Sequence, residues 1–193
     1  LWKSNGTSAG TVMVKDLQPG SYGSVPNPLT NAAGKLLFAA TDGTTGYELW
    51  TSDGTSVGTT QIKDISSGSA GSSVDSILNL NGILYFAAND GTSGKELWRS
   101  DGTSGGTYRV ADINAGPNSS NPTALTTVNG MIYFVADNGI NGQELWKTDG
   151  SQGGTSLVRD IVAGAGTSSP SNLTNVGGTL FFTANWSNLG IEL

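Results

Sequence analysis

Apolar and polar residues alternate along this chain in a pattern that returns every 48 residues. In one copy, residues 74–121, four short runs of apolar and β-branched residues are separated by turns rich in Gly, Asn and Asp. Such runs predict β-strands, and no stretch shows the 3.6-residue period of an amphipathic helix. We therefore expect four strands per copy, named A to D here in chain order, and use "column" for the residues that share one place in every copy.

The turn between strands A and B carries a strong local signal. Asn81-Gly82 separates the apolar runs at 74–80 and 83–88. Asn-Gly favours a type I′ hairpin turn, because that turn needs a positive φ at both central residues. Glycine holds the second place in all four copies, as Gly34, Gly82, Gly130 and Gly178. Strands A and B are therefore predicted to pair as an antiparallel hairpin.

Strand B is apolar on both faces, whereas strand D is mixed. Leu84 and Phe86 share one face of strand B, and Tyr85 and Ala87 share the other. An inner strand covered by neighbouring sheets needs this pattern. Each copy would expose apolar faces if it stood alone, so the copies must pack on one another. The sequence predicts an all-β fold, a β-propeller of four-stranded antiparallel blades.

The expected domain is a single repeat domain over residues 1–193. Its blades are predicted at 26–73, 74–121 and 122–169, with a composite blade from 170–193 plus 1–25. Four blades can close as one ring, or the chain can be half of a larger, eight-bladed propeller completed by another copy. The chain opens inside a motif and stops inside its last copy, so we expect an excerpt of a longer chain.

Composition narrows the function classes. The chain has no cysteine and no histidine, which excludes disulfides, thiol nucleophiles and the usual zinc ligands, and removes the commonest general base. Its net charge of −6 argues against nucleic-acid partners. No apolar run approaches the ~20 residues of a membrane helix, so membrane insertion is not expected. No cofactor is predicted other than calcium.

The stretch Glu96-Leu97-Trp98-Arg99-Ser100-Asp101-Gly102-Thr103 recurs with small changes in the other copies. It resembles the ELWxxDGT repeat family, and the likeness covers nearly the whole chain. The resemblance implies an exported bacterial repeat protein of propeller type, secreted or at the cell surface. It implies no substrate.

The tryptophan column is predicted to be structural. Its members are Trp2, Trp50, Trp98 and Trp146. Glutamate and tryptophan two residues apart in a strand share a face, which we expect to pack between blades. The rival interpretation is an exposed platform on which sugars stack.

Fixed acidic columns offer calcium sites or turn caps. The candidates for calcium end strand D, as Asp16, Asp64, Asp112 and Asp160. Carboxylates suit calcium, yet no copy shows the dense ladder of an EF-hand. The structural interpretation is that these aspartates accept amide hydrogen bonds from loops. Aspartates before glycine, such as Asp53 and Asp101, are expected to cap the C–D turn.

The preferred binding surface is the rim where B–C and D–A loops meet. In an up-and-down blade these loops lie at the same end of the sheet. The candidate ligand-binding residues there are Asp42, Asn89, Asp90, Asp137, Asn138, Ser24, Ser72 and Ser120. Small hydroxyl, amide and carboxylate groups can hydrogen-bond sugar hydroxyls.

The predicted function is a non-catalytic extracellular or cell-surface repeat scaffold for adhesion, assembly or ligand binding. One alternative is a lectin-like propeller with one weak glycan site per blade, and another is a calcium-stabilised structural repeat. A glycosidase is disfavoured, because enzymes build one asymmetric site whereas these acids repeat evenly. The expected partners are a second copy or further repeats of a longer chain, and glycans.

Overall fold

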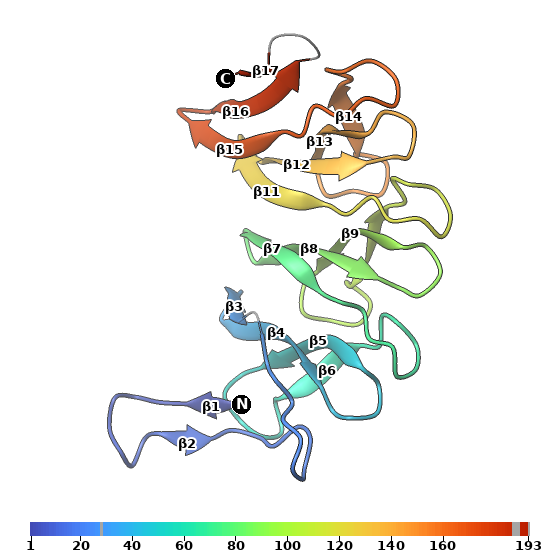
Figure 1. Cartoon of the computed structure of the whole chain (residues 1–193). Helices are drawn as coiled ribbons and strands as arrows, with labels where there is room; N and C mark the ends of the chain where they lie inside the picture. The colour runs from blue at the N-terminus through green and yellow to red at the C-terminus, as the bar shows by residue number, and fades with distance from the viewer. Residues whose placement is uncertain (28, 187–189, 193) are drawn as a thin grey trace.

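The computed structural model describes residues 1–27, 29–186 and 190–192, and every regular element in that part of the chain is a β-strand. A short hairpin is followed by three four-stranded sheets and one three-stranded sheet, all antiparallel (Figure 1). The all-β class and the repeated four-stranded antiparallel sheets are thus confirmed. No helix in the described part has the length and hydropathy needed to cross a bilayer.

The strands follow one another in space in chain order. The first hairpin has β1 (Trp2–Lys3) and β2 (Val12–Met13). The first full sheet has β3 (Leu29–Ala32), β4 (Lys35–Thr41), β5 (Tyr47–Ser52) and β6 (Thr60–Lys63). The second has β7 (Asp75–Leu80), β8 (Ile83–Asn89), β9 (Lys95–Ser100) and β10 (Tyr108–Ala111). The third has β11 (Thr123–Val128), β12 (Met131–Asp137), β13 (Gln143–Thr148) and β14 (Ser156–Arg159). The last has β15 (Ser171–Val176), β16 (Thr179–Trp186) and β17 (Gly190–Glu192).

The A–B turns take the backbone conformation that the sequence predicts. Asn81 and Gly82 have φ angles of 53° and 85°. Ala33 and Gly34 have φ angles of 50° and 80°, so even alanine is held in the left-handed region there. Two positive φ angles in succession match the right-handed twist of a two-residue hairpin. The hairpin prediction is confirmed, and it is a purely local outcome.

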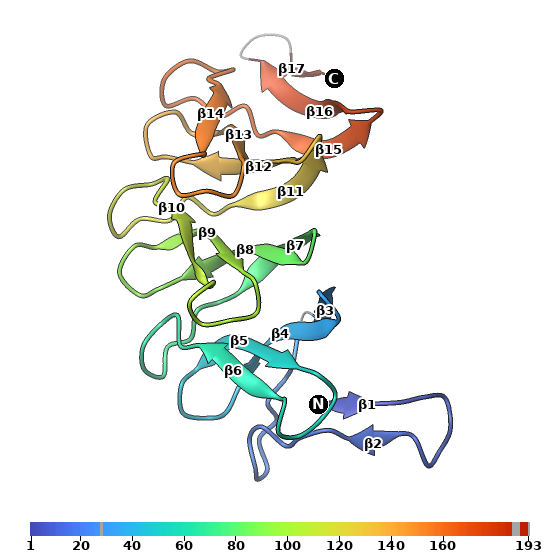
Figure 2. The same ribbon diagram turned by 180° about the vertical axis from the view of Figure 1, so that it is seen from behind.

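The sheets stack face to face along the molecule (Figure 1; Figure 2 shows the same order from behind). The first strands of successive sheets contact one another, β3 with β7, β7 with β11, and β11 with β15. Between the first two full sheets, Leu37 and Ala39 of β4 share one buried cluster with Phe86 of β8. Burial of strand B on both faces is therefore confirmed for β4, β8 and β12, whereas β16 in the last sheet is partly exposed.

The tryptophan column is buried in three copies and exposed in one. Trp50, Trp98 and Trp146 are 6%, 6% and 9% exposed and belong to clusters that join neighbouring units. The indole Nε1 atoms of Trp50 and Trp146 donate to the carbonyls of Ala40 and Ala136 at 3.0 and 3.1 Å. Trp2 is 65% exposed. The expected packing between sheets is therefore seen for Trp50, Trp98 and Trp146, whereas no described sheet lies against Trp2.

The sheets do not close into a ring. The hairpin β1–β2 and the sheet β15–β17 are separate, and the two termini lie at opposite ends of the stack (Figure 1). Instead of completing the last sheet, the N-terminal segment packs Leu1 and Leu17 against Phe38 and Trp50 of the first full sheet. The described residues therefore form neither a four-bladed ring nor the composite blade of 170–193 with 1–25. Membership of a larger ring stays a prediction.

Candidate functional site

The B–C and D–A loops meet at one end of each sheet and build a continuous rim. The amide of Ser72, in a D–A loop, donates to the carbonyl of Tyr47 at 2.9 Å. The carbonyl of Ser72 in turn accepts from the amide of Asn89 in the next sheet at 2.8 Å. Ser120 repeats both bonds with Lys95 and Asp137, at 3.1 and 3.0 Å. The predicted sharing of one rim by these loops is confirmed.

The aspartate that opens each B–C turn binds its own loop. Asp42 Oδ1 accepts the amides of Thr44 and Thr45 at 2.8 and 2.9 Å. Asp90 Oδ1 accepts the amides of Thr92 and Ser93 at 2.9 and 2.7 Å. This is the Asx-turn geometry in which a short carboxylate replaces a backbone acceptor. One carboxylate oxygen of each residue is thereby committed to the turn.

The third copy builds the same turn with an amide. Asn138 Oδ1 accepts the amides of Ile140 and Asn141 at 3.0 and 2.8 Å. Its Nδ2 donates to Asn141 Oδ1 at 2.9 Å. A neutral amide oxygen therefore suffices for the turn, and the negative charge of Asp42 and Asp90 is not required by it.

Those hydrogen bonds lower the pKa values of the rim aspartates. Partial burial would raise the pKa of Asp42, but the donors Thr45 and Thr44 outweigh it and lower that pKa to about 2. The pKa of Asp90 is lowered by the same balance, with Thr92 and Ser93 as donors. Asp90 Oδ2 also lies 3.7 Å from a guanidinium nitrogen of Arg109. Both carboxylates are ionised at neutral pH, and both are half-buried.

Asn89 and Asp137 stand one residue earlier and cap the same turns. Asn89 Oδ1 accepts the amide of Gly91 at 2.8 Å, and Asp137 Oδ1 accepts that of Gly139 at 2.7 Å. Both side chains are half-buried. The rim thus keeps the second carboxylate oxygens of Asp42 and Asp137 and the amide group of Asn89 for an external partner.

Two of the three predicted D–A loop serines lie inside the molecule. Ser72 and Ser120 are buried, and Ser24 is half-buried. The Ser72 hydroxyl donates to the carbonyl of Tyr47 at 3.1 Å, and the Ser120 hydroxyl donates to Glu96 Oε2 at 2.6 Å. Ser72 and Ser120 therefore hold the loop in place and do not face the rim surface of this chain.

Buried glutamates anchor the D–A loops that follow the full sheets, a role that was expected of the strand D aspartates. Glu48 accepts the amides of Ile65 and Ser66 at 2.9 and 3.2 Å, and Glu96 accepts those of Ile113 and Ser120, both at 2.9 Å. Burial raises the pKa of Glu48 and of Glu96, while the amide donors oppose that rise. The sequence does carry a signal for this role: a glutamate that shares a buried strand face with a repeated tryptophan needs hydrogen-bond donors inside the protein.

The strand D aspartates do not gather into a metal centre. Among the described residues no group of three or more Asp, Glu, His or Cys side chains is placed to hold a metal ion. Asp160 Oδ2 accepts from Asn141 Nδ2 at 2.8 Å and from the amide of Gly164 at 3.1 Å. Asp112 pairs with Arg109 at 3.5 Å, and Asp16 and Asp64 are exposed. Calcium stays a prediction.

The C–D turns are capped as predicted. Asp53 Oδ1 accepts the amide and the hydroxyl of Thr55 at 2.8 and 2.7 Å. Asp101 does the same with Thr103 at 2.9 and 2.7 Å. A Cβ atom at Gly106 would lie 2.0 Å from Asp101 Oδ1, which explains why glycine follows five residues later.

Comparisons with known proteins give a likeness of fold. No family model and no curated protein matches the chain. The crystal structure of a mutant puromycin hydrolase complexed with PGG is similar over 82% of this chain and 25% of that one, at 16% identity and a TM-score of 0.51. The computationally designed Ika8 protein is similar over 90% of this chain and 46% of that one, at 16% identity and a TM-score of 0.43. The chain thus spans a quarter to less than half of these structures.

Proposed function

We propose that the chain is a non-catalytic repeat scaffold that works outside the cell in adhesion, assembly or ligand binding. One observation carries this proposal: the repeated acidic side chains accept hydrogen bonds from the molecule's own turns and loops. The B–C acids cap their turns, the C–D acids cap theirs, and the buried glutamates hold the D–A loops. The extracellular location depends on the resemblance to the ELWxxDGT family alone.

The stack is proposed to be part of a β-propeller. Support comes from the contacts between the first strands of successive sheets, which would line the axis of a propeller. The apolar faces between sheets are a second support, since blades pack in this way around a ring. An open stack of four units is consistent with half of an eight-bladed propeller.

Absence of catalysis is proposed on chemical grounds. The sequence has no histidine, and Ser72 and Ser120 of the rim loops are buried with their hydroxyls bonded internally. A serine nucleophile needs an adjacent base and access to substrate. The hydrolase named above is a fold likeness that this chain covers only in part, so its activity is not carried over. A screen with chromogenic esters, peptides and glycosides should show no turnover, and saturable turnover would refute the proposal.

The second candidate is a lectin-like rim, favoured by the second carboxylate oxygen of Asp42 and the amide group of Asn89, both in half-buried side chains. A glycan array separates the two functions. The scaffold predicts no retained glycan, whereas a lectin predicts weak binding that Asp42→Asn and Asn89→Ala reduce together. Thermal unfolding with calcium and then with a chelator tests the calcium-stabilised alternative, which predicts a midpoint that rises with calcium.

A further inference from the structure

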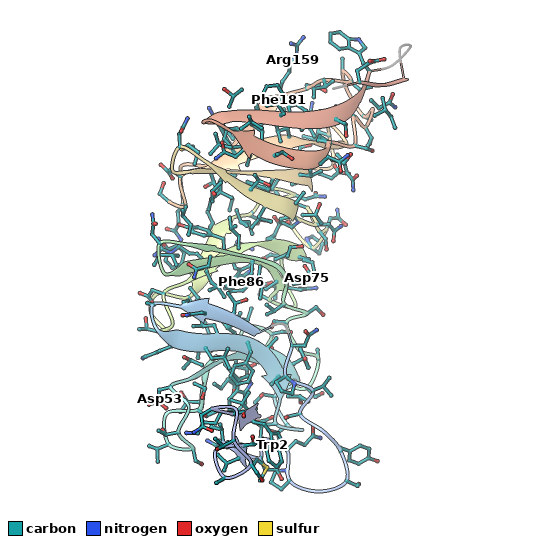
Figure 3. The ribbon with its side chains drawn as sticks, turned by 90° about the vertical axis from the view of Figure 1, so that its left-hand side faces the viewer. Trp2, Asp53, Asp75, Phe86, Arg159 and Phe181 are labelled. Atoms are coloured by element: carbon teal, nitrogen blue, oxygen red, sulfur yellow. The ribbon has the colours of Figure 1, made fainter. Side chains whose placement is uncertain are left out.

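The contacts between successive sheets are not the same along the stack. We call the contact surface between the first and second full sheets the first seam, and that between the second and third full sheets the second seam. In Figure 3 the second seam separates the green sheet, which carries Phe86, from the yellow strands of the next sheet. Each of these two seams contains a buried apolar cluster. Apolar packing is therefore common to both, and the polar contacts distinguish them.

On the rim side the two seams are connected in the same way. The carbonyl of Ser72 accepts the amide of Asn89 across the first seam at 2.8 Å, and that of Ser120 accepts the amide of Asp137 across the second at 3.0 Å. The D–A loop also joins the two sheets covalently on this side. The rim side is therefore held in both seams, and any difference lies at the opposite side, where the A–B and C–D turns are.

A lysine of strand D connects the two sheets of the first seam on the C–D side. Lys63 Nζ donates to the carbonyl of Thr107, in the next sheet, at 2.7 Å. One period earlier, Lys15 Nζ donates in the same way to the carbonyl of Thr59 at 2.7 Å. A charged donor makes a stronger hydrogen bond than a neutral one. The bond recurs with the repeat, so it belongs to the way these sheets pack.

The second seam has no such bond, because the lysine column continues with Ala111 in the second full sheet. Alanine has no side-chain donor for the carbonyl of Thr155, which is the counterpart of Thr107. Burial reflects the change: Thr107 is 0% exposed, whereas Thr155 is half-buried. The C–D side of the second seam is therefore both less connected and less covered than that of the first.

The A–B side of the second seam lacks a bond as well. Asn79 Nδ2 donates to the carbonyl of Asn31 across the first seam. Asn175 Nδ2 donates to the carbonyl of Thr127 at 2.9 Å, between the third full sheet and the last sheet. In the third full sheet the same column holds Thr127 itself, whose shorter side chain has no amide group. The column therefore connects the sheets on either side of the second seam to their other neighbours, but not to each other.

The turns on that side show the same difference in packing. A Cβ atom at Gly82 would lie 3.2 Å from Ala33 Cβ across the first seam, whereas one at Gly130 would meet nothing within 4 Å. One side chain of the second full sheet reaches the third at its C–D turn, because a Cβ atom at Gly150 would lie 2.1 Å from the phenol oxygen of Tyr85. Within residues 1–27, 29–186 and 190–192, no side-chain hydrogen bond crosses the second seam. Its turn side is held by packing.

We propose that the second seam is a hinge of this stack. It opens on the side of the A–B and C–D turns, while the rim bond between Ser120 and Asp137 stays closed and acts as the pivot. Apolar packing permits this motion because it is not directional, whereas a hydrogen bond across the seam would be broken by a shift of about 1 Å. Repeat arrays open where the contacts between neighbours are fewest. The hinge concerns motion inside the stack and does not depend on the proposed scaffold role.

A buried thiol can report the opening of each seam, because the chain has no cysteine of its own. Leu84 and Ile132 share one column, both are 0% exposed, and they belong to the clusters of the first and the second seam. Leu84→Cys and Ile132→Cys are each treated with a thiol reagent in native buffer, where labelling requires that the seam opens. We expect Ile132→Cys to react at least about 10-fold faster, since two hydrogen bonds of about fivefold each hold the first seam alone. Equal or slower labelling of Ile132→Cys would overturn the proposal.

The dependence of labelling on urea separates a hinge from unfolding of the whole chain. Hinge opening exposes little surface, so the labelling rate of Ile132→Cys should rise with urea much less steeply than the equilibrium constant for global unfolding. Circular dichroism gives that constant for each variant and shows that both fold. A slope equal to that of global unfolding would mean that Ile132→Cys reacts only in the unfolded chain, and the hinge would be refuted.

Moving the lysine bond from one seam to the other tests its cause. Ala111→Lys, added to Ile132→Cys, supplies the donor that Lys63 provides in the first seam, and should slow labelling about fivefold. Ala111→Met, of similar length but without a donor, is the matched control and should leave the rate unchanged. Lys63→Ala, added to Leu84→Cys, should speed labelling by a similar factor. A rate of Leu84→Cys that Lys63→Ala leaves unchanged, or an equal effect of Ala111→Lys and Ala111→Met, would contradict the proposal.

Discussion

The interior of the stack and its two ends are built from the same columns, yet they differ in burial. Trp98 and Tyr85 are covered by neighbouring sheets, whereas Trp2 and Phe181 in the same columns are exposed. The strands themselves form in both regions, because hairpin turns and β-propensity act locally. The difference shows that each repeat specifies its own sheet, whereas its apolar faces are buried only by packing against neighbouring repeats.

The sharpest way to break this comparison is to truncate an interior tryptophan. Trp98→Ala removes a large side chain from the cluster between the first two full sheets. Deleting a buried aromatic leaves a cavity, so the free energy of unfolding should fall by about 3–5 kcal/mol. Urea unfolding followed by circular dichroism measures this.

Trp2→Ala is the matched end variant. Its effect on the unfolding of the single chain should stay within about 0.5 kcal/mol, as for a surface residue. The comparison requires dilute protein, where the chain is alone. An equal loss of stability in the two variants would mean that Trp2 is buried in the single chain.

The next largest effect on stability is expected at the glutamate column, where Glu96 is buried and Glu192 is exposed. Glu96→Gln leaves one acceptor oxygen for the donors Ile113 and Ser120 and turns an NH₂ group toward them. We expect a loss of about 2 kcal/mol, because a buried donor then lacks its partner. Urea unfolding at neutral pH measures it. Glu192→Gln, at the exposed end of the same column, should leave the stability of the single chain unchanged.

The C–D turns allow a comparison of two adjacent glycines. A Cβ atom at Gly106 would meet the Asp101 carboxylate, whereas one at Gly105 would meet nothing within 4 Å. Gly106→Ala should therefore cost about 1–2 kcal/mol, since Asp101 must give up its bonds to Thr103. Gly105→Ala should stay within about 0.5 kcal/mol of the wild type. Thermal unfolding of both variants shows whether glycine is needed at position 106 to avoid the Asp101 carboxylate or whether the turn needs glycine at both positions for backbone flexibility.

The smallest effect concerns charge at the rim. Asp42 has a folded pKa of about 2 against an ordinary value of 3.8, so its ionised form stabilises the fold above pH 3.8. That contribution is lost as the pH falls through about 2. Asp42→Asn should cost about 1 kcal/mol at pH 7, reduced by solvent screening, and almost nothing at pH 2. Urea unfolding at both pH values measures the difference.

The third copy supplies the opposite variant. Asn138→Asp places a carboxylate in the same turn and should add an acid-sensitive contribution of the same sign. If the difference in unfolding free energy between Asn138→Asp and the wild type were the same at pH 7 and pH 2, the charge at this turn would not contribute to stability.

Much of the fold was predictable from particular residues. Asn81-Gly82 predicted a hairpin with two positive φ angles, and the alternating faces of strand B predicted burial on both sides. Asp53 and Asp101 were predicted to cap their turns, and they do. These outcomes depend on short-range geometry, which the sequence displays directly.

The site was harder to predict. Ser72 and Ser120 were placed at a binding rim, but the folded loops turn them inward. The loop-anchoring role of Glu48 and Glu96 was not predicted, because their amide donors lie 17 residues or more further along the chain. Sequence spacing alone does not show which loop folds back onto which carboxylate.

The sequence by itself determined the 48-residue sheet, its hairpins and its turn caps, because neighbouring residues set backbone angles. Only the tertiary structure decided which faces are covered, how the rim loops engage the buried glutamates, and that the two chain ends stay apart. Burial is the physical reason for this division. A face becomes core only when another sheet lies against it, and no local pattern places that sheet.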